Sequence, residues 1–337
     1  MAAGMKKDKG ERRRGTPRAW IMRQMRLPLI IASIACSLAH ADSSREAPAK
    51  PGASSRRMGL DIRVEPGGWG EADTRQIETV LYAVADELMA RLPEKLAAPI
   101  VVSHTESNPV ALYERGPGGE YRVELHAKGD KWHLYVYEFA HELCHILSNY
   151  DKNVGPHAVK YNQWFEETLC ETASLFTLNS LAATWEASPP EPRWAGEARK
   201  LRRFFDHLIS EGHRQLPPHA PLSAWLRENE SGLRQNPYLR SKNEVLANLL
   251  LPLFRNNPQN WDALGYLNLT PVDARSTLEV YLRDWYDNAP LEHKRFVASV
   301  LALLWDRETP PAVGDVTAVT APASDIALTV ALSDVTR

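Results

Sequence analysis

The chain has 337 residues, and its 44% hydrophobic and 24% charged content is ordinary for one or two domains with a packed core. Basic and acidic residues are nearly balanced, 40 against 42, unlike the strongly basic composition of proteins that bind nucleic acid. Beyond residue 41 the sequence has no segment apolar enough to cross a membrane. Neither nucleic acid nor a membrane span is therefore expected.

The first 41 residues have the three parts of a secretory signal peptide. Residues 18–26 are basic, residues 27–38 form an apolar run, and Ala39-His40-Ala41 has the small-x-small pattern of a cleavage site. The apolar run is too short to span a membrane as a stable helix. We therefore expect an exported protein, either secreted or periplasmic.

Two details of this region stay open in the sequence. The basic stretch is long, so the true start could be Met22 or Met25. Cys36 suggests a lipoprotein signal, but Ser33 stands where leucine is usual, so lipid anchoring is the less favoured alternative. Residues 1–41 hold nine of the 40 basic and two of the 42 acidic residues, which leaves 31 and 40, a net charge near −9. Such an acidic chain is a poor partner for nucleic-acid phosphates.

Four elements are predicted after a leader at residues 42–58, which is rich in Ser, Ala, Pro and Arg and is expected to be flexible. Apolar residues recur with a helical period over residues 73–92. Alternating or β-branched patterns predict strands at residues 60–64, 99–103 and 121–127. These elements indicate a small mixed sheet packed against helices.

The run His141-Glu142-Leu143-Cys144-His145 carries the strongest chemical signal in the sequence. Two histidines four residues apart lie on nearly the same face of a helix, about 6 Å apart along its axis, so both can bind one tetrahedral Zn²⁺. Glu142 projects beside the metal, where it can take a proton from a water molecule. Uncharged flanks favour a buried helix, predicted from about Trp132 to Asn149, over a chance match on a surface helix.

A catalytic zinc needs a third protein ligand, and Trp164-Phe165-Glu166-Glu167 supplies the candidates. At this point the chain resembles the gluzincins, zinc peptidases that follow HExxH with a glutamate on a second helix, often within Trp-x-x-Glu. The resemblance implies Glu167 as the ligand, because Glu167 is in register with that pattern. Glu166 is the alternative and would point about 100° away on the same helix.

The same resemblance implies roles for three further features. Glu171, one turn beyond Glu167, would hydrogen-bond and orient His141; the alternative is a solvated helix charge. The strand at residues 120–127 would be an edge strand that pairs with an extended substrate, the alternative being a purely structural strand. Tyr238, in a Pro-Tyr segment 71 residues beyond Glu167, would donate a hydrogen bond to the transition-state oxyanion.

Other residues could serve as that donor, and two clan motifs are missing. The alternatives to Tyr238 are His157, Tyr161, His207 and His213. The sequence lacks the thermolysin-type Asn-Glu-x-x-Ser-Asp segment and the Gly-x-Met-Glu-Asn segment by which aminopeptidases of this clan bind a free amino terminus. The second absence argues against exopeptidase activity and does not affect the metal site.

Two cysteines remain after signal cleavage, and each lies on a helix of the expected metal site. Cys144 is inside the zinc motif and Cys170 is on the helix of the third ligand. In an oxidising compartment they could form a disulfide that closes a loop of about 26 residues and stabilises the fold by about 3 kcal/mol. The alternative is a pair of buried free thiols.

The second half of the chain is predicted to be mainly helical. A proline-rich linker around residue 190 separates it from the ligand helix, and a Ser241-x-x-Glu244 capping box is expected to start one of its helices. The helices are expected at residues 198–210, 241–254, 272–286 and 291–305.

The sequence thus predicts an α+β fold with a zincin-like catalytic domain, a small mixed sheet plus two zinc-ligand helices, at residues 59–188. A helical C-terminal subdomain would follow at residues 189–307, and a disordered tail at residues 308–337.

The expected function is that of an exported metallopeptidase with one Zn²⁺ held by His141, His145 and Glu167. Its substrate would be a peptide or protein, and Glu142 would act as general base. The alternatives are a zinc hydrolase acting on a non-peptide ester or amide, and a catalytically silent zincin-like binding protein.

Overall fold

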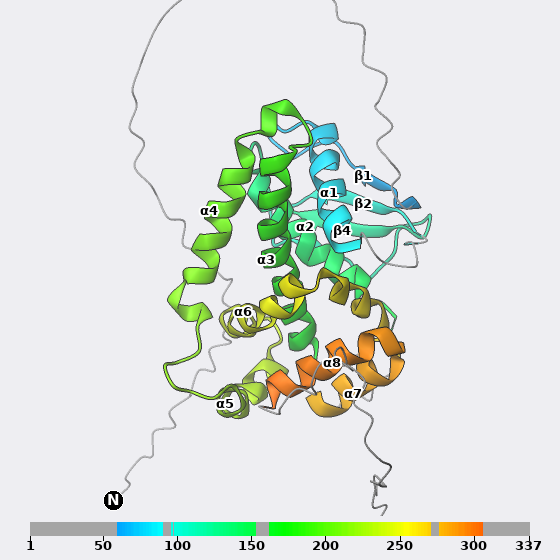
Figure 1. The fold of residues 1–337 in the computed structure, drawn as a ribbon. Coiled ribbons are helices and arrows are strands. Elements are labelled where there is room, and N and C mark those ends of the chain that lie inside the picture. The colour runs from blue at the N-terminus through cyan, green and yellow to red at the C-terminus, as the bar shows by residue number, and fades with distance from the viewer. Residues whose placement is uncertain (1–58, 90–95, 97, 153–161, 271–275, 306–337) are drawn as a thin grey trace, which may run out of the picture. The chain divides into compact units, whose positions relative to one another are not determined.

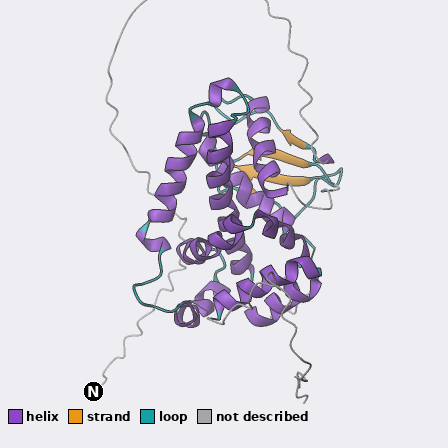
Figure 2. Ribbon diagram, in the orientation of Figure 1, coloured by secondary structure: helices purple, strands orange, loops and turns teal. Residues whose placement is uncertain are grey.

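The computed structural model describes residues 59–89, 96, 98–152, 162–270 and 276–305, which form one small sheet and a larger set of helices (Figures 1 and 2). The predicted α+β class is confirmed. In these ranges the structure shows no helix that is both long and apolar enough for a bilayer.

Several predictions fall outside the described residues. They concern the signal peptide at residues 1–41 with Met22, Met25 and Cys36, the leader at 42–58, the tail at 308–337, and the donor candidates His157 and Tyr161. The described residues all belong to a single unit of dense contacts, so the boundary near residue 188 stays a prediction about subdomains.

The sheet has four strands in the order β1-β2-β4-β3. Three predicted strands are present as β1 (Ile62–Val64), β2 (Ile100–His104) and β4 (Tyr121–Leu125), and they run parallel. A two-residue strand that the sequence did not reveal, β3 (Val110–Ala111), pairs antiparallel with β4. The edge of the sheet beside β4 is therefore occupied by β3.

This arrangement corrects the proposed role of residues 120–127. The segment does form a strand, but β4 lies between β2 and β3 and has both of its edges paired. The edge on this side of the sheet belongs to Val110 and Ala111, of which Val110 is exposed and Ala111 is buried. Two residues are too few for an alternating pattern, which is why β3 could not be recognised from hydrophobicity alone.

Helix α1 (Thr74–Met89) covers the sheet through an apolar stripe. Its buried residues recur at Ile77, Val80, Leu81, Val84 and Leu88, the spacing of one helix face. They pack against β1 and against the next helix, α2 (Trp132–Leu147). The hydrophobic pattern that predicted a helix at residues 73–92 therefore also determined which face became buried.

Helix α2 and helix α3 (Gln163–Ala187) are the most extensively packed pair in the described structure. Thirteen of the sixteen residues of α2 are buried, and α3 has buried residues around its whole circumference for most of its length. This is because α3 contacts α2 on one side and α4 (Glu197–Ser210) and α6 (Arg240–Asn256) on others (Figure 1). A helix surrounded in this way is a rigid base for side chains that must keep a fixed geometry.

The second half of the chain is helical, as predicted. Besides α4 and α6 it contains α5 (Leu222–Gln235), which was not predicted, α7 (Leu278–Asn288) and α8 (Leu291–Leu304). The predicted helix at residues 272–286 corresponds to α7, and residues 271–275 lie outside the described ranges.

The expected capping box of α6 is wrong. The helix begins at Arg240, its N-cap is Leu239, and the cap has no side-chain hydrogen bond. Ser241 is already inside the helix. The carboxylate of Glu244 accepts hydrogen bonds from two arginines, which provide stronger, charge-assisted contacts than a capping amide.

Candidate metal centre

His141 and His145 extend from α2 toward α3 and stay partly accessible in an otherwise buried region. Their side chains are 21% and 11% exposed. Glu167 approaches from α3 with a side chain that is 12% exposed. Because α2 and α3 are packed along their length, the three groups are held by rigid backbone.

The carboxylate of Glu167 faces the Nε2 atoms of both histidines. Glu167 Oε2 lies 3.2 Å from His141 Nε2, and Glu167 Oε1 lies 3.7 Å from His145 Nε2. Two ligand atoms on one tetrahedral Zn²⁺, with bonds of about 2.0–2.1 Å, are about 3.3 Å apart. The donor set of two imidazoles and one carboxylate therefore fits a catalytic zinc in chemistry, and its two carboxylate–imidazole distances are close to this spacing.

Glu166 occupies a different position and has a different partner. Its side chain is 1% exposed, and Oε1 lies 2.7 Å from His145 Nδ1, the ring nitrogen that faces away from Glu167. A carboxylate on Nδ1 fixes the tautomer that leaves Nε2 for a metal. The sequence left both glutamates open as ligands, and the structure places Glu167 at the shared space and Glu166 behind His145.

Asn268 continues the support behind Glu166. Its Nδ2 donates to Glu166 Oε2 at 2.9 Å and to the Ser148 carbonyl at 2.8 Å, while the Tyr281 hydroxyl donates to Asn268 Oδ1 at 2.9 Å. Asn268 adopts φ 57°, a left-handed conformation that asparagine tolerates better than most residues. This chain of hydrogen bonds anchors His145 to the C-terminal helical region.

Cys170 is a second candidate for the third donor. Donor atoms of His141, His145 and Cys170 lie within 4.8 Å of one another, and all three could hold a metal ion. The Glu167 carboxylate faces both Nε2 atoms at 3.2 and 3.7 Å, and a fully buried thiol is a less available ligand. Burial, reinforced by the neighbouring Cys144, raises the pKa of Cys170 well above its ordinary value and keeps it protonated. We therefore favour Glu167.

The two cysteines are buried free thiols in this structure. This is the alternative to a disulfide that the sequence left open. Cys144 and Cys170 nevertheless contact each other across the α2–α3 interface, because the Cys144 side chain forms a hydrogen bond with Cys170.

Glu142 is oriented by the edge strand. The backbone N–H of Ala111 donates to Glu142 Oε2 at 2.7 Å, and the residue is 4% exposed. Burial raises the pKa of Glu142, and the charge of Glu167 acts in the same direction, while His141 and His145 oppose it. A carboxylate with a raised pKa beside two candidate metal ligands has the properties of a general base.

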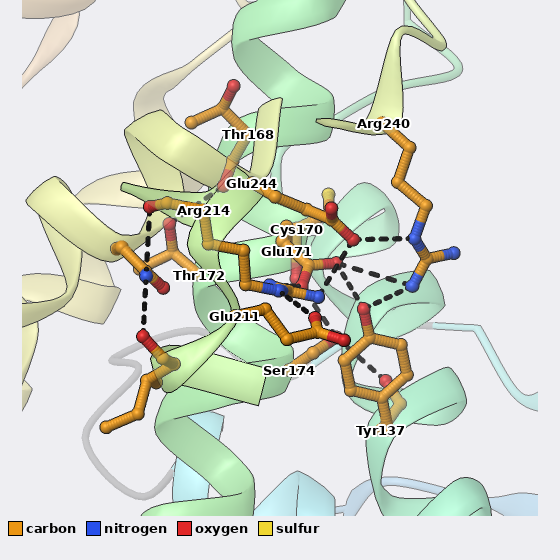
Figure 3. Close-up of polar contacts among 12 residues, drawn as sticks. Tyr137, Thr168, Cys170, Glu171, Thr172, Ser174, Glu211, Arg214, Arg240 and Glu244 are labelled. Carbon is orange, nitrogen blue, oxygen red and sulfur yellow. Dashed lines mark hydrogen bonds and ion pairs between the residues drawn. The ribbon is translucent and has the colours of Figure 1, made fainter. Parts of the chain in front are cut away.

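Glu171 does not orient His141, which corrects the role that the resemblance implied. Its hydrogen bonds come from the Tyr137 hydroxyl and from Arg214 Nη1, the latter at 2.7 Å (Figure 3). Nor is it a solvated charge, because it is 3% exposed. Burial alone would raise its pKa, but Arg240, Arg214 and the Tyr137 hydroxyl outweigh burial, so the pKa of Glu171 is lowered.

Arg214 is the centre of a buried ion cluster that includes Glu171, one helical turn from the candidate metal ligand Glu167. Its side chain is 1% exposed, and it donates to Glu171, to Glu211 at 3.0 Å and to Glu244 at 2.8 Å (Figure 3). Arg240 adds contacts to Glu244 and to Tyr137 from the start of α6. The cluster joins the C-terminal helices to both ligand helices, and the sequence contained no local signal for it.

Tyr238 lies near the candidate metal ligands, and its role as a donor stays a prediction. Its hydroxyl accepts a hydrogen bond from Gln163 Nε2 at 3.0 Å, and Gln163 is one turn before Glu167 on α3. Partial burial of the hydroxyl, followed by the charge of Glu167, raises the pKa of Tyr238, so the hydroxyl is protonated at neutral pH. Tyr113, which the sequence did not single out, contacts the same amide at 3.4 Å.

The two described histidine alternatives to Tyr238 lie elsewhere. His213 Nε2 is 2.8 Å from Glu244 in the ion cluster. His207 is on α4 with a 68% exposed side chain, 3.7 Å from Glu211.

The ligand residues influence one another's protonation. Burial would lower the pKa of His145, but the carboxylates of Glu167 and Glu166 outweigh burial and raise it well above the ordinary value of 6.5. Burial would raise the pKa of Glu167, but His145 and His141 outweigh it, so this pKa is lowered. In the metal-free protein the pair is therefore an imidazolium beside a carboxylate.

Comparison with known proteins identifies no relative of this chain. No protein-family model, no curated protein and no solved structure matches the chain. A functional assignment therefore depends on the residues themselves.

Proposed function

We propose that the protein is a zinc-dependent hydrolase that cleaves peptide bonds, an exported metallopeptidase of gluzincin type. One observation carries the proposal: the Nε2 atoms of His141 and His145 both face the Glu167 carboxylate at 3.2 and 3.7 Å, with buried Glu142 between the two histidines in the chain. Three ligands plus an adjacent carboxylate is the composition of a catalytic zinc site.

A zinc ion held by these three residues would supply a Lewis acid that polarises the scissile carbonyl and lowers the pKa of a water molecule. The protein contributes the remaining functions. Glu166 and Asn268 hold His145 in the tautomer that presents Nε2. Packing of α2 against α3 keeps the three donors in place when the site is empty.

Glu142 would transfer the proton. The Ala111 N–H engages Oε2, so Oε1 is the oxygen that can accept a proton from the attacking water and deliver it to the leaving amine. The raised pKa of Glu142 supports this role, because a base with a very low pKa would not retain the proton long enough to return it.

Strand β3 supports peptides as the substrate class. It is the antiparallel edge of the sheet, and Ala111 contacts Glu142 directly. An edge strand can recognise an extended backbone through the main-chain groups that its neighbouring strand leaves unpaired, as in other β-augmentation complexes. A peptide paired with β3 would place its carbonyl groups close to Glu142 and the metal ligands.

Tyr238 would complete the site as the donor to the transition-state oxyanion. Its protonated hydroxyl and its electrostatic coupling to Glu167 support this role. A donor that contacts the developing oxyanion contributes to catalysis together with the metal.

The test is cleavage of a complex peptide library by the purified chain from Asp42, supplied with zinc and analysed by mass spectrometry. We expect that chelation abolishes cleavage and that Glu142→Gln lowers it by at least about 10³-fold. The Glu142→Gln variant should still bind zinc. Glu186→Gln, an exposed position on α3, is the matched control and should cleave normally.

The other outcomes discriminate among the functions. Cleavage that persists in Glu142→Gln contradicts the mechanism. A zinc-binding protein that cleaves no peptide but hydrolyses model esters or amides is another class of hydrolase. One that does neither is a binding protein.

A further inference from the structure

Gln163, the first residue of α3, connects two tyrosines from distant parts of the chain. Its Nε2 donates to the Tyr238 hydroxyl at 3.0 Å and, at a longer 3.4 Å, to the Tyr113 hydroxyl. Tyr113 lies in the connection from β3 to β4, and Tyr238 lies between α5 and α6. One amide group therefore joins the sheet side of the molecule to the helical region.

The position of Gln163 on α3 directs these contacts toward the metal ligands. Residues four apart share a helix face, so the side chains of Gln163 and Glu167 leave α3 on the same side. The charge of Glu167 raises the pKa of Tyr238 more than any other neighbouring charge does, after the effect of burial. The hydroxyl held by Gln163 is therefore close to the carboxylate that faces both histidines.

The direction of the hydrogen bond has a chemical consequence. An amide nitrogen can only donate, so the Tyr238 oxygen is the acceptor and its own O–H hydrogen is not used in this bond. Tyr238 is 62% exposed, so the hydroxyl can also reach a bound molecule. Stabilisation of an oxyanion requires this arrangement, a donor oriented before the reaction begins.

We propose that Gln163 is a positioning residue that orients the Tyr238 hydroxyl as a hydrogen-bond donor toward the substrate carbonyl. This inference rests on the proposed peptidase function. It assigns Gln163 an effect on kcat rather than on substrate affinity, because the oriented O–H contributes when the oxyanion forms. Tyr113 shares the amide and helps to fix the side chain of Gln163.

The kinetic test compares substitutions that differ in hydrogen-bond direction. Gln163→Ala removes the donor and should lower kcat on the order of 10-fold with little change in KM. Gln163→Glu should lower kcat further, because a carboxylate can only accept a hydrogen bond. The Tyr238 hydroxyl would then donate to the introduced carboxylate instead of to the substrate carbonyl. Gln259→Glu places the same charge on an exposed residue of the turn Pro258–Tyr266 and should leave kcat unchanged.

A double-mutant cycle shows whether Gln163 acts through Tyr238. In a Tyr238→Phe background, Gln163→Ala should change kcat by less than about twofold, because the group that it positions is gone. Equal effects of Gln163→Ala in both backgrounds would overturn the proposal. So would a Gln163→Glu variant that is as active as the native protein.

A second measurement needs no catalysis and no metal. NMR of ring-labelled tyrosine, with the Tyr238 resonance identified by its absence in Tyr238→Phe, follows ionisation of this hydroxyl. Gln163→Ala should raise the pKa of Tyr238, because the donated N–H stabilises the phenolate. An unchanged pKa overturns the contact itself. Absence of hydrolysis in the native protein, with the pKa shift present, instead overturns the proposed function.

Discussion

His145 Nδ1 lies 2.7 Å from Glu166 Oε1, so the two ring nitrogens of His145 have different partners. Nδ1 is bound to a carboxylate that is 1% exposed and is held in turn by Asn268. Nε2 is left facing Glu167. The two adjacent glutamates of α3 therefore act from opposite sides of one imidazole.

The role of Glu166 predicts a selective loss of metal affinity. Glu166→Gln keeps the size of the side chain but weakens the contact to Nδ1, so zinc affinity should fall about 10- to 100-fold while one ion still binds. Competition with a fluorescent zinc chelator measures this. Glu186→Gln is the control. An unchanged affinity would mean that Glu166 is only a packing residue.

Substitution of the two candidate third donors distinguishes Glu167 from Cys170. Glu167→Ala should abolish stoichiometric zinc binding, whereas Cys170→Ala should retain it, because the carboxylate faces both Nε2 atoms and burial keeps the Cys170 thiol protonated. His141→Ala should also lose the metal, with exposed His207→Ala as its control. Metal content after dialysis is the readout. Loss of zinc in Cys170→Ala with retention in Glu167→Ala would make the Cys170 sulfur the third ligand.

Zinc binding should strengthen as the pH rises. Because the pKa of His145 is raised in the metal-free protein, its imidazole carries a proton at neutral pH that must leave when a metal binds. Calorimetry in buffers with different heats of ionisation should show proton release near pH 7. Release of no proton in the native protein would contradict the raised pKa.

The same two groups predict the pH dependence of stability without metal. The raised pKa of His145 makes a contribution to the free energy of unfolding that is fully present below pH 6.5. This contribution is lost as the pH rises through the pKa of His145 in the folded protein. The lowered pKa of Glu167 contributes stability that is present above 4.5 and is lost as the pH falls. The contribution of the pair to the free energy of unfolding is therefore largest between pH 4.5 and pH 6.5. Urea unfolding in chelator should show a stronger pH dependence in the native protein than in Glu167→Gln, in which only Glu166 still raises the pKa of His145.

Removal of Arg214 should destabilise the fold strongly. Arg214→Met takes from Glu171 and Glu244, which are 3% and 4% exposed, the buried cation that contacts them at 2.7 and 2.8 Å. Breaking a buried pair from one side costs about 3–5 kcal/mol. Arg283→Met breaks an exposed pair with Glu279 and should change the free energy of unfolding by less than about 1 kcal/mol. Similar losses in both variants would show that the cluster is not a stabilising centre.

The local chemistry of the site could be predicted from the sequence. His141, Glu142 and His145 are within one helix, and the apolar period around them already indicated that this helix is buried. Three of the four strands and α1, α2, α4, α6 and α8 were also found, because hydrophobic periodicity is a property of neighbouring residues.

The partners of the charged residues were decided only by the tertiary structure. Glu166, Glu167 and Glu171 lie within six positions of one helix, and nothing local shows that they face His145, the shared space and Arg214, respectively. Those assignments depend on Asn268 and Arg214, which are 102 and 43 residues away from their partners.

The edge strand shows the same limit. Whether β4 or β3 borders the sheet depends on a two-residue pairing that no hydrophobic pattern encodes. The sequence by itself determined which residues could bind a metal and transfer a proton, because those are properties of the side chains and of helical spacing. The tertiary structure decided which of these residues meet, because pairing between distant segments is set by how the helices and strands pack.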